Sequence, residues 1–212
     1  MTDHYYTDKP ISKNNVFRYA VNINEVQFQF FSNSGVFSKQ GIDFGSRLLI
    51  DTVLEDADMI ESGLSNEEKP SLADLGCGIG VIGIVLNRLL KINSTYLYDI
   101  NERAITLAKM NIDNNASKRT YAIKKDIVNE QILERADICV SNPPIRAGKK
   151  TVFAFYERAY ELLNKNGTFY CVIQKKQGSE STKNKLNDLF GNSEIIQRSA
   201  GYHIYKCVKN CD

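Results

Sequence analysis

The stretch SLADLGCGIG (residues 71–80) decides how this chain of 212 residues folds. Its first five residues are mostly apolar and predict a short strand over 71–75. The glycines at 76, 78 and 80 predict a tight turn, and the apolar run over 81–90 predicts a helix directly after it. Such a turn lets the backbone approach a ligand closely, with the free N–H groups of the helix N-terminus beside it.

Strands and helices alternate outward from this turn. The alternation indicates parallel strands joined by crossover helices, which is a doubly wound α/β sheet. The last two strands have no helix between them, so we expect them to pair antiparallel at one end of the sheet. We expect strands at 71–75, 94–100, 121–125, 137–141, 167–174, 194–198 and 203–208, and helices at 81–90, 102–115, 152–163 and 181–190.

The first 70 residues precede this alternation. They begin with a polar arm, and alternating apolar residues over 16–23 and 26–31 predict a β-hairpin around Asn24 and Glu25. Helical spacing follows over 46–60, and a polar loop over 61–70. We therefore expect an N-terminal arm and hairpin at 1–33 and a second unit at 34–212.

Composition narrows the class of protein. Hydrophobic residues make up 42% and charged residues 25% of the chain, which is a globular balance. No apolar run is long enough for a membrane span, and the N-terminus lacks the apolar core of a signal peptide. Five scattered cysteines and two histidines make a structural zinc site improbable. We therefore expect a cytoplasmic protein with reduced thiols, no metal and no membrane partner.

The glycine turn supports two interpretations. Gly78, Gly80 and Gly83 match the dinucleotide fingerprint, with Asp99 at the place of a ribose-binding acid. Alternatively, Asp74 stabilises a nucleoside-binding turn and binds the amino group of the ligand. In that case Asp99 binds both ribose hydroxyls, because a carboxylate accepts two hydrogen bonds at once.

Asp126 adds a third acid at the end of a strand. Ligands of open α/β sheets bind outside the carboxyl ends of the strands, so Asp74, Asp99 and Asp126 would line one crevice. Asp126 would accept a hydrogen bond from an adenine amino group, or it would be the N-cap of a helix over 127–133. The sequence leaves both possibilities open.

An Asn-Pro-Pro corner follows the strand over 137–141. Each proline restricts the residue before it to extended geometry and donates no hydrogen bond. The amide oxygen of Asn142 and the backbone carbonyl of Pro143 therefore form a stiff pair of acceptors. Such a pair suits an –NH2 group, whose lone pair it would free to attack an electrophile.

Together these motifs resemble the class I S-adenosylmethionine-dependent methyltransferases of the small-domain type, and in particular the ribosomal RNA small subunit methyltransferase C family. The resemblance runs through GVFS (35–38), IDFGSRLL (42–49), DLGCGIG (74–80), NPPIRAGKK (142–150) and VIQKKQG (172–178). It implies a Rossmann-like class I methyltransferase fold, with a mostly parallel seven-stranded sheet, an antiparallel C-terminal strand and a small N-terminal hairpin. The methyltransferase domain would be 34–212, without the degenerate first domain of larger members.

The resemblance also implies an activity and a site. The family transfers a methyl group from S-adenosyl-L-methionine to the exocyclic N2 of a guanine in 16S rRNA, so rRNA or the small ribosomal subunit would be the partner. The catalytic residues would be Asn142, Pro143 and Pro144. The cofactor-binding residues would be Gly45, Ser46, Asp74, Gly76, Cys77, Gly78, Gly80, Asp99, Ile100, Asp126, Ile127 and Asn142.

Basic residues follow the acceptor corner and the next strand, and they suit the RNA backbone. The expected substrate-binding residues are Ile145, Arg146, Lys149, Lys150, Lys175 and Lys176. Many relatives have an aromatic residue where this chain has Ile145, which packs on a base but offers no π-stacking. Phe37 and Phe44 would stack on a base or pack under the hairpin, and we favour packing.

Other functions compete with this one. Adenine-N6 and protein glutamine-N5 methyltransferases share Asn-Pro-Pro, but they usually have an aromatic fourth residue. A nicotinamide-dependent oxidoreductase would explain the dinucleotide fingerprint and leave the acceptor corner unexplained. A non-catalytic RNA-binding module would not need Asp74, Asp99 and Asn142 together. The sequence makes no prediction of the oligomeric state.

Overall fold

A seven-stranded mixed sheet forms the centre of the computed structural model, which describes residues 16–33, 41–56 and 69–210. The strand order is β5-β4-β3-β6-β7-β9-β8. Only β9 runs antiparallel to its neighbours among these strands, which confirms the antiparallel pairing of the last two strands. The strands are β3 (Ser71–Leu75), β4 (Ser94–Asp99), β5 (Thr120–Lys124), β6 (Ala136–Ser141), β7 (Leu163–Gln174), β8 (Glu194–Ser199) and β9 (Tyr202–Val208).

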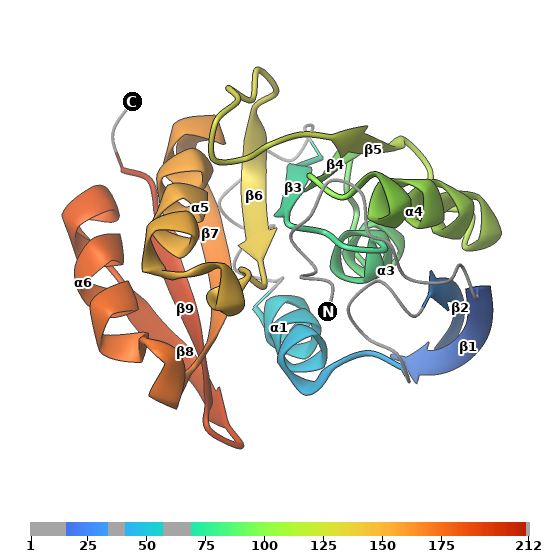
Figure 1. Ribbon diagram of the computed structural model, residues 1–212, viewed down its shortest axis with the longest axis horizontal. Helices are drawn as coiled ribbons and strands as arrows, with labels where there is room; N and C mark the ends of the chain where they lie inside the picture. The colour runs from blue at the N-terminus through green and yellow to red at the C-terminus, as the bar shows by residue number, and fades with distance from the viewer. Residues whose placement is uncertain (1–15, 34–40, 57–68, 211–212) are drawn as a thin grey trace, which may run out of the picture.

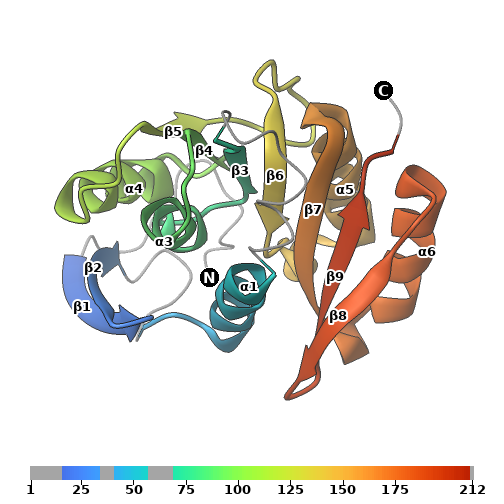
Figure 2. The ribbon, with the colours of Figure 1, turned by 180° about the vertical axis from the view of Figure 1, so that it is seen from behind.

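Helices cover both faces of the sheet (Figures 1 and 2). One face packs against α1 (Phe44–Glu55), α3 (Val81–Leu89) and α4 (Glu102–Asn114), and the other against α5 (Lys149–Leu162) and α6 (Ser179–Phe190). Two short 3-10 helices, η1 (Ile145–Ala147) and η2 (Lys175–Gln177), follow β6 and β7. The three-layer arrangement is the predicted Rossmann-like class I methyltransferase fold.

Alternating side chains divide the core between the two faces. On β7, Tyr170 and Val172 pack with α1 and α3, whereas Cys171 and Ile173 pack with α5 and α6. Cys139 and Cys171 are fully buried, as expected for small core residues. Residues 138–140 of β6 and 169–173 of β7 are buried on both faces of the sheet, and both runs are continuously apolar, which is typical of parallel strands.

The N-terminal hairpin consists of β1 (Val16–Ile23) and β2 (Val26–Asn33). Asn24 and Glu25 have positive φ angles of 44° and 63°, which two-residue hairpin turns require. The hairpin packs on α4, where the Asn111 side chain bonds both backbone groups of Phe31 at 2.7 and 3.1 Å. Phe28 and Phe30 are buried in the core shared with α3 and α4, so this hairpin extends the α4 face.

Some boundaries differ from the prediction. Helix α5 begins three residues before the predicted 152, because Lys149, Lys150 and Thr151 are solvent-facing or half-buried and fall outside the apolar periodicity. Strand β7 begins at Leu163 rather than at 167, since Leu163 already pairs with Ala136 before a register shift. Helix α1 begins at Phe44 rather than at 46, and residues 57–60 of the predicted helix lie outside the described residues.

Across the described ranges, no helix is both long and apolar enough to cross a membrane.

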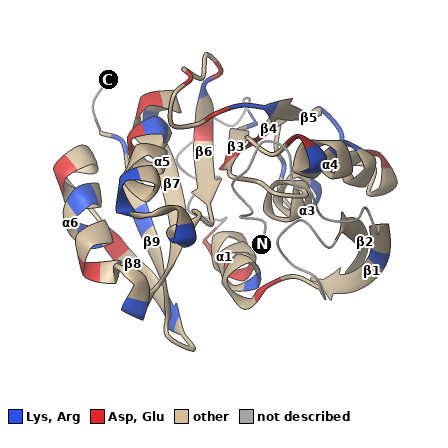
Figure 3. Cartoon of the chain, in the orientation of Figure 1, with Lys and Arg blue, Asp and Glu red and all other residues tan. Residues whose placement is uncertain are grey.

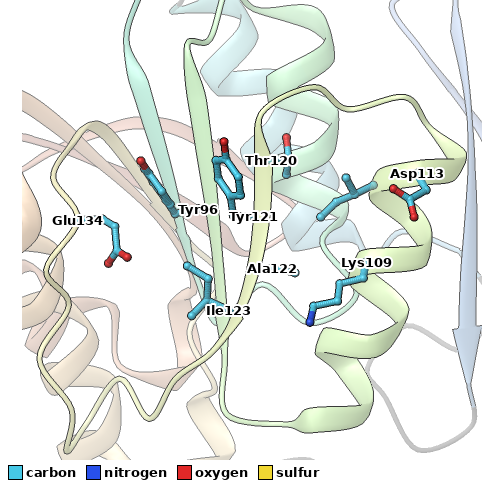
Figure 4. Close-up of a pocket in the computed structure, with 9 residues that line it drawn as sticks. Tyr96, Lys109, Asp113, Thr120, Tyr121, Ala122, Ile123 and Glu134 are labelled. Atoms are coloured by element: carbon cyan, nitrogen blue, oxygen red, sulfur yellow. The ribbon is translucent and has the colours of Figure 1, made fainter.

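A groove of about 790 Å³ lies at the β5 edge of the sheet. Figure 4 shows Tyr96 and Tyr121 on neighbouring strands of this groove, with Lys109 on α4. The residues lining the groove include no predicted site residue, so the candidate site is elsewhere, at the carboxyl ends of the strands.

Candidate active site

The glycine turn connects β3 to α3 and is fixed against β4. The N–H groups of Gly76 and Cys77 both donate to the carbonyl of Tyr98 at 2.9 Å. Gly76, Gly78 and Gly80 have positive φ angles of 75°, 56° and 86°. A Cβ at Gly76 would lie 2.9 Å from the ring of Phe155, so the glycine is required both for its conformation and for its close approach.

Asp74 lies directly behind the turn and is fully buried. Its Oδ2 accepts a hydrogen bond from the N–H of Gly83 at 3.0 Å, in the first turn of α3. Its Oδ1 is buried without a hydrogen-bond partner. Burial, with a smaller contribution from Asp99, raises the pKa of Asp74 from 3.8 to about 7. A buried acceptor without a partner is costly, so a cationic group of a ligand beside it would be stabilised.

Asp99 closes the same turn from β4. Its Oδ2 accepts from the N–H of Gly78 at 2.8 Å and its Oδ1 from the N–H of Asn101 at 2.8 Å. Burial raises its pKa above the ordinary value. A carboxylate offers about four acceptor sites, so Asp99 keeps acceptor capacity for a ligand hydroxyl. Two buried acids beside the turn disfavour a pyrophosphate and suit a nucleoside with positive charge.

Asp126 lies two residues beyond β5. Its Oδ1 accepts from the N–H groups of Val128 and Asn129, at 3.0 and 3.3 Å, and so closes a turn. Residues 127–133 form no helix, so the N-cap alternative is wrong. The N–H of Lys125 donates to the carbonyl of Asp99, which brings Asp126 next to the β4 end. The neighbouring residues Ile127 and Ile100 are buried and half-buried.

The acceptor corner adjoins the glycine turn. Ser141 is in register with Leu75, and its hydroxyl donates to the Leu75 carbonyl at 2.8 Å. Asn142 therefore lies beside Gly76. The Pro144 carbonyl accepts from Ala147, whereas the Pro143 carbonyl accepts no hydrogen bond within the described part of the chain. This assigns Pro144 to the following turn and leaves Pro143 available as an acceptor.

The first turn of α1 orients Asn142. The Nδ2 of Asn142 donates to Ser46 Oγ at 3.0 Å and to Asp43 Oδ1 at 3.3 Å. Asp43 is also the N-cap of α1 and accepts from the N–H of Ser46. Because α1 engages the NH2 end of the amide, the Oδ1 end is left to accept from a ligand. Sequence reasoning missed Asp43, although an Asp directly before a helical run is an N-cap signal.

Gly45 lets this turn approach β9. A Cβ at Gly45 would lie 3.2 Å from the ring of Tyr202 and 3.3 Å from Asp43 Oδ1. A larger residue would therefore push the turn away from β9 and from Asn142. Gly45 and Ser46 were predicted beside the cofactor, and the structure places them at the acceptor corner.

Cys77 is buried in the glycine turn, where burial raises the pKa of its thiol well above the usual range.

The predicted cations lie on neighbouring segments at this edge. Figure 3 shows blue segments where α5 begins and where β7 leads into α6. All five cations are exposed, and none forms an ion pair with another described residue. Ile145 is half-buried and packs on the α5 core. The cations are Arg146 in η1, Lys149 and Lys150 at the start of α5, and Lys175 and Lys176 in η2.

No group of three metal-ligating side chains occurs among the described residues. The arrangement instead offers two chemically different halves. The turn between β3 and α3 offers glycine backbone and two buried acids. The corner after β6 offers neutral acceptors, with cations beyond them. A nucleoside ligand with positive charge fits the first half, and an amine fits the second.

Comparison with known proteins identifies the family of the chain. The family model described as "Methyltransferase small domain" matches residues 27–206. The chain is 39% identical to the uncharacterized protein YbxB of Bacillus subtilis, over 99% of this chain and all of that protein. It is 28% identical to a ribosomal RNA small subunit methyltransferase C of Psychromonas ingrahamii, over 90% of this chain and 51% of that protein. It thus spans about half the length of that enzyme.

Among solved structures, a 16S rRNA N2 methyltransferase of T. thermophilus in complex with AdoMet and guanosine is similar, with a TM-score of 0.77. The alignment covers 95% of this chain and 52% of that chain at 23% sequence identity. At this identity, the similarity shows the fold.

Proposed function

Because the chain belongs to the methyltransferase small domain family of S-adenosylmethionine-dependent methyltransferases, we propose that it methylates the exocyclic N2 amine of a guanine in 16S rRNA. Membership of this family is evidence against the nicotinamide oxidoreductase. The rRNA substrate is supported by the curated relatives that match most of this chain and by the exposed cations beside the acceptor corner.

The acceptor corner carries the proposal. Asn142 Oδ1 and the Pro143 carbonyl accept no hydrogen bond within the described part of the chain, and they follow the strand next to β3. Two such acceptors hold an –NH2 group by both of its protons and direct its lone pair away from the ring. Neither Asn142 nor Pro143 is titratable, so these two acceptors bind a neutral amine and do not act as a base.

The cofactor roles follow from the buried acids and the glycine turn. S-adenosylmethionine, when bound, would supply a sulfonium methyl group: the amine nitrogen would take the methyl group, neutral S-adenosylhomocysteine would leave, and the methylated amine would release its proton to water. Asp74 Oδ1 is the buried acceptor available to the cofactor's amino group, and Asp99 retains acceptor sites for the ribose hydroxyls. Asp126 would accept from the adenine amino group. Holding both reactants in line would supply most of the rate enhancement.

The test is methyl transfer with product identification. Purified protein is incubated with tritium-labelled S-adenosylmethionine and with unmodified 16S rRNA or unmodified small subunits, and the RNA is digested to nucleosides. Label in N2-methylguanosine is the expected result, and the better substrate shows whether transfer precedes assembly. Label in N6-methyladenosine, or label only in added protein, would overturn the proposed substrate and keep the methyltransferase site.

A further inference from the structure

Phe44 is an exposed aromatic residue at the edge of the acceptor corner. It is the first residue of α1, and 47% of its surface is exposed. Sequence reasoning favoured packing under the hairpin, and the structure shows instead that its ring lies against Tyr202 of β9. The two ring centroids are 5.4 Å apart, at an interplanar angle of 44°. Phe37, the other candidate, lies outside the described residues.

This aromatic pair shares a backbone turn with the residues that orient Asn142. Phe44 is flanked by Asp43 and Gly45, and both Asp43 and Ser46 accept hydrogen bonds from the Asn142 amide. Because the first helical turn is rigid, the ring of Phe44 has a fixed relation to the corner. An aromatic side chain here is not needed for the helix, since phenylalanine is an indifferent helix former and half of this one is left in water.

The pair also adjoins the basic segment after β7. Tyr202 pairs with Gln174, and the N–H of Lys175 donates to the carbonyl of Gly201 at 2.7 Å. Gln174, the partner of Tyr202, is the last residue of β7, and the exposed Lys175 and Lys176 come directly after it. Neutral acceptors, an aromatic surface and two cations thus succeed one another along a single edge of the molecule.

We propose that Phe44, supported by Tyr202, is a stacking surface for a nucleobase of the RNA substrate. This inference rests on the proposed function and deepens it. Exposed aromatic rings beside cations are how proteins hold unpaired bases, because every base has a π face and every nucleotide a phosphate. Ile145 packs on the core and has no π face, so Phe44 supplies the stacking that an aromatic residue after Asn-Pro-Pro would supply.

The first experiment uses fluorescence and does not depend on turnover. The chain contains no Trp, so Phe44→Trp introduces a single reporter. The variant is saturated with S-adenosylhomocysteine and titrated with unmodified 16S rRNA. Stacking on a base should quench the reporter. Tyr121→Trp is the matched control, since Tyr121 is 49% exposed and lies on edge strand β5 in the groove of Figure 4. Its fluorescence should remain unchanged.

The second experiment measures kinetics. Phe44→Leu should lower kcat/KM for RNA about tenfold, and Phe44→Tyr should restore it, because stacking needs a ring and not merely an apolar side chain. S-adenosylmethionine affinity and Tm should match the wild-type values. An unchanged kcat/KM in Phe44→Leu, with the wild type active on RNA, would overturn the stacking surface and leave the proposed function intact.

The two hypotheses fail in different ways. If the wild type labels no RNA and 16S rRNA does not quench Phe44→Trp, both are wrong. If it labels no RNA but the quench occurs, the stacking surface stands and the proposed reaction does not. Quenching by a glutamine-containing peptide alone, with none by RNA, would assign this surface to a protein substrate and overturn the inference.

Discussion

The two halves of the candidate site are built in opposite ways. The β3–β4 half is local and buried: Asp74 and Asp99 bond backbone groups between residues 78 and 101 and are nearly inaccessible. The β6–β7 half is long-range and open: Asn142 is held by α1 from 96 and 99 positions away, and its cations are exposed. Changes to the first half should therefore alter stability, and changes to the second should alter activity alone.

The largest expected effect concerns Asp74. Its pKa is about 7 in the folded chain, above the ordinary 3.8. The folded protein keeps this proton as the pH rises above about 4, so the free energy of unfolding falls by on the order of 4 kcal/mol by about pH 8. Asp74→Asn should remove most of this dependence of the unfolding free energy on pH, because the amide does not titrate. Urea unfolding of the cofactor-free protein from about pH 4 to about pH 8 measures this fall in the free energy of unfolding.

The variant should also be more stable than the wild type at about pH 8 and bind S-adenosylmethionine more weakly. Asp99, whose pKa burial also raises, should leave a residual fall of the free energy of unfolding with rising pH in the variant. Equal slopes in wild type and variant would show that Asp74 does not titrate in this range and would remove the contrast in stability between the halves.

The second prediction concerns Asn142. Asn142→Ala should lower kcat by at least about a hundredfold, the usual cost of losing one preorganised hydrogen-bonding group of an active site. Affinity for S-adenosylhomocysteine, measured by calorimetry, and Tm should stay near wild type. A loss of cofactor affinity as large as the loss of kcat would mean that the two halves are not separable.

The third prediction concerns the exposed cations. The double substitution Lys175→Gln and Lys176→Gln should weaken RNA binding about tenfold at low salt and reduce the slope of log affinity against log salt concentration by about 1.4. The free energy of unfolding should not change, because both side chains are exposed and form no ion pair with another described residue. An unchanged salt slope would exclude these lysines from the RNA contact.

The smallest prediction concerns Ser46. Ser46→Ala removes the 3.0 Å hydrogen bond to Asn142, while Asp43 still accepts from the same amide. We expect kcat to fall about fivefold, the cost of one neutral hydrogen bond. Ser46→Thr keeps the hydroxyl and should recover activity if the pocket admits its methyl group. An effect as large as that of Asn142→Ala would assign Ser46 a direct contact with a reactant.

The contrast between the halves also explains what the sequence could predict. The strand at 71–75 and both hairpin strands begin where predicted, because alternation and turn residues are local signals. Gly76 and Asp99 were placed at the turn for the same reason, and the structure has both there. The contacts of Asp43 with Asn142 and of Phe44 with Tyr202 join distant segments, and no local pattern encodes them. The basic edge was predictable because strand ends of a parallel sheet share one side.

The antiparallel direction of β9 has a consequence for how the protein folds during its synthesis. Because β9 runs against β7, its first residue lies beside the last residue of β7, at the same edge as the acceptor corner. Ribosomes build chains from the N-terminus, and local contacts form sooner than distant ones. The hydrogen bonds from Gly83 to Asp74 and from Gly78 to Asp99 can therefore form while β9 is still unsynthesised. A nascent chain would therefore complete the cofactor half of the candidate site before the half that is proposed to contact the substrate.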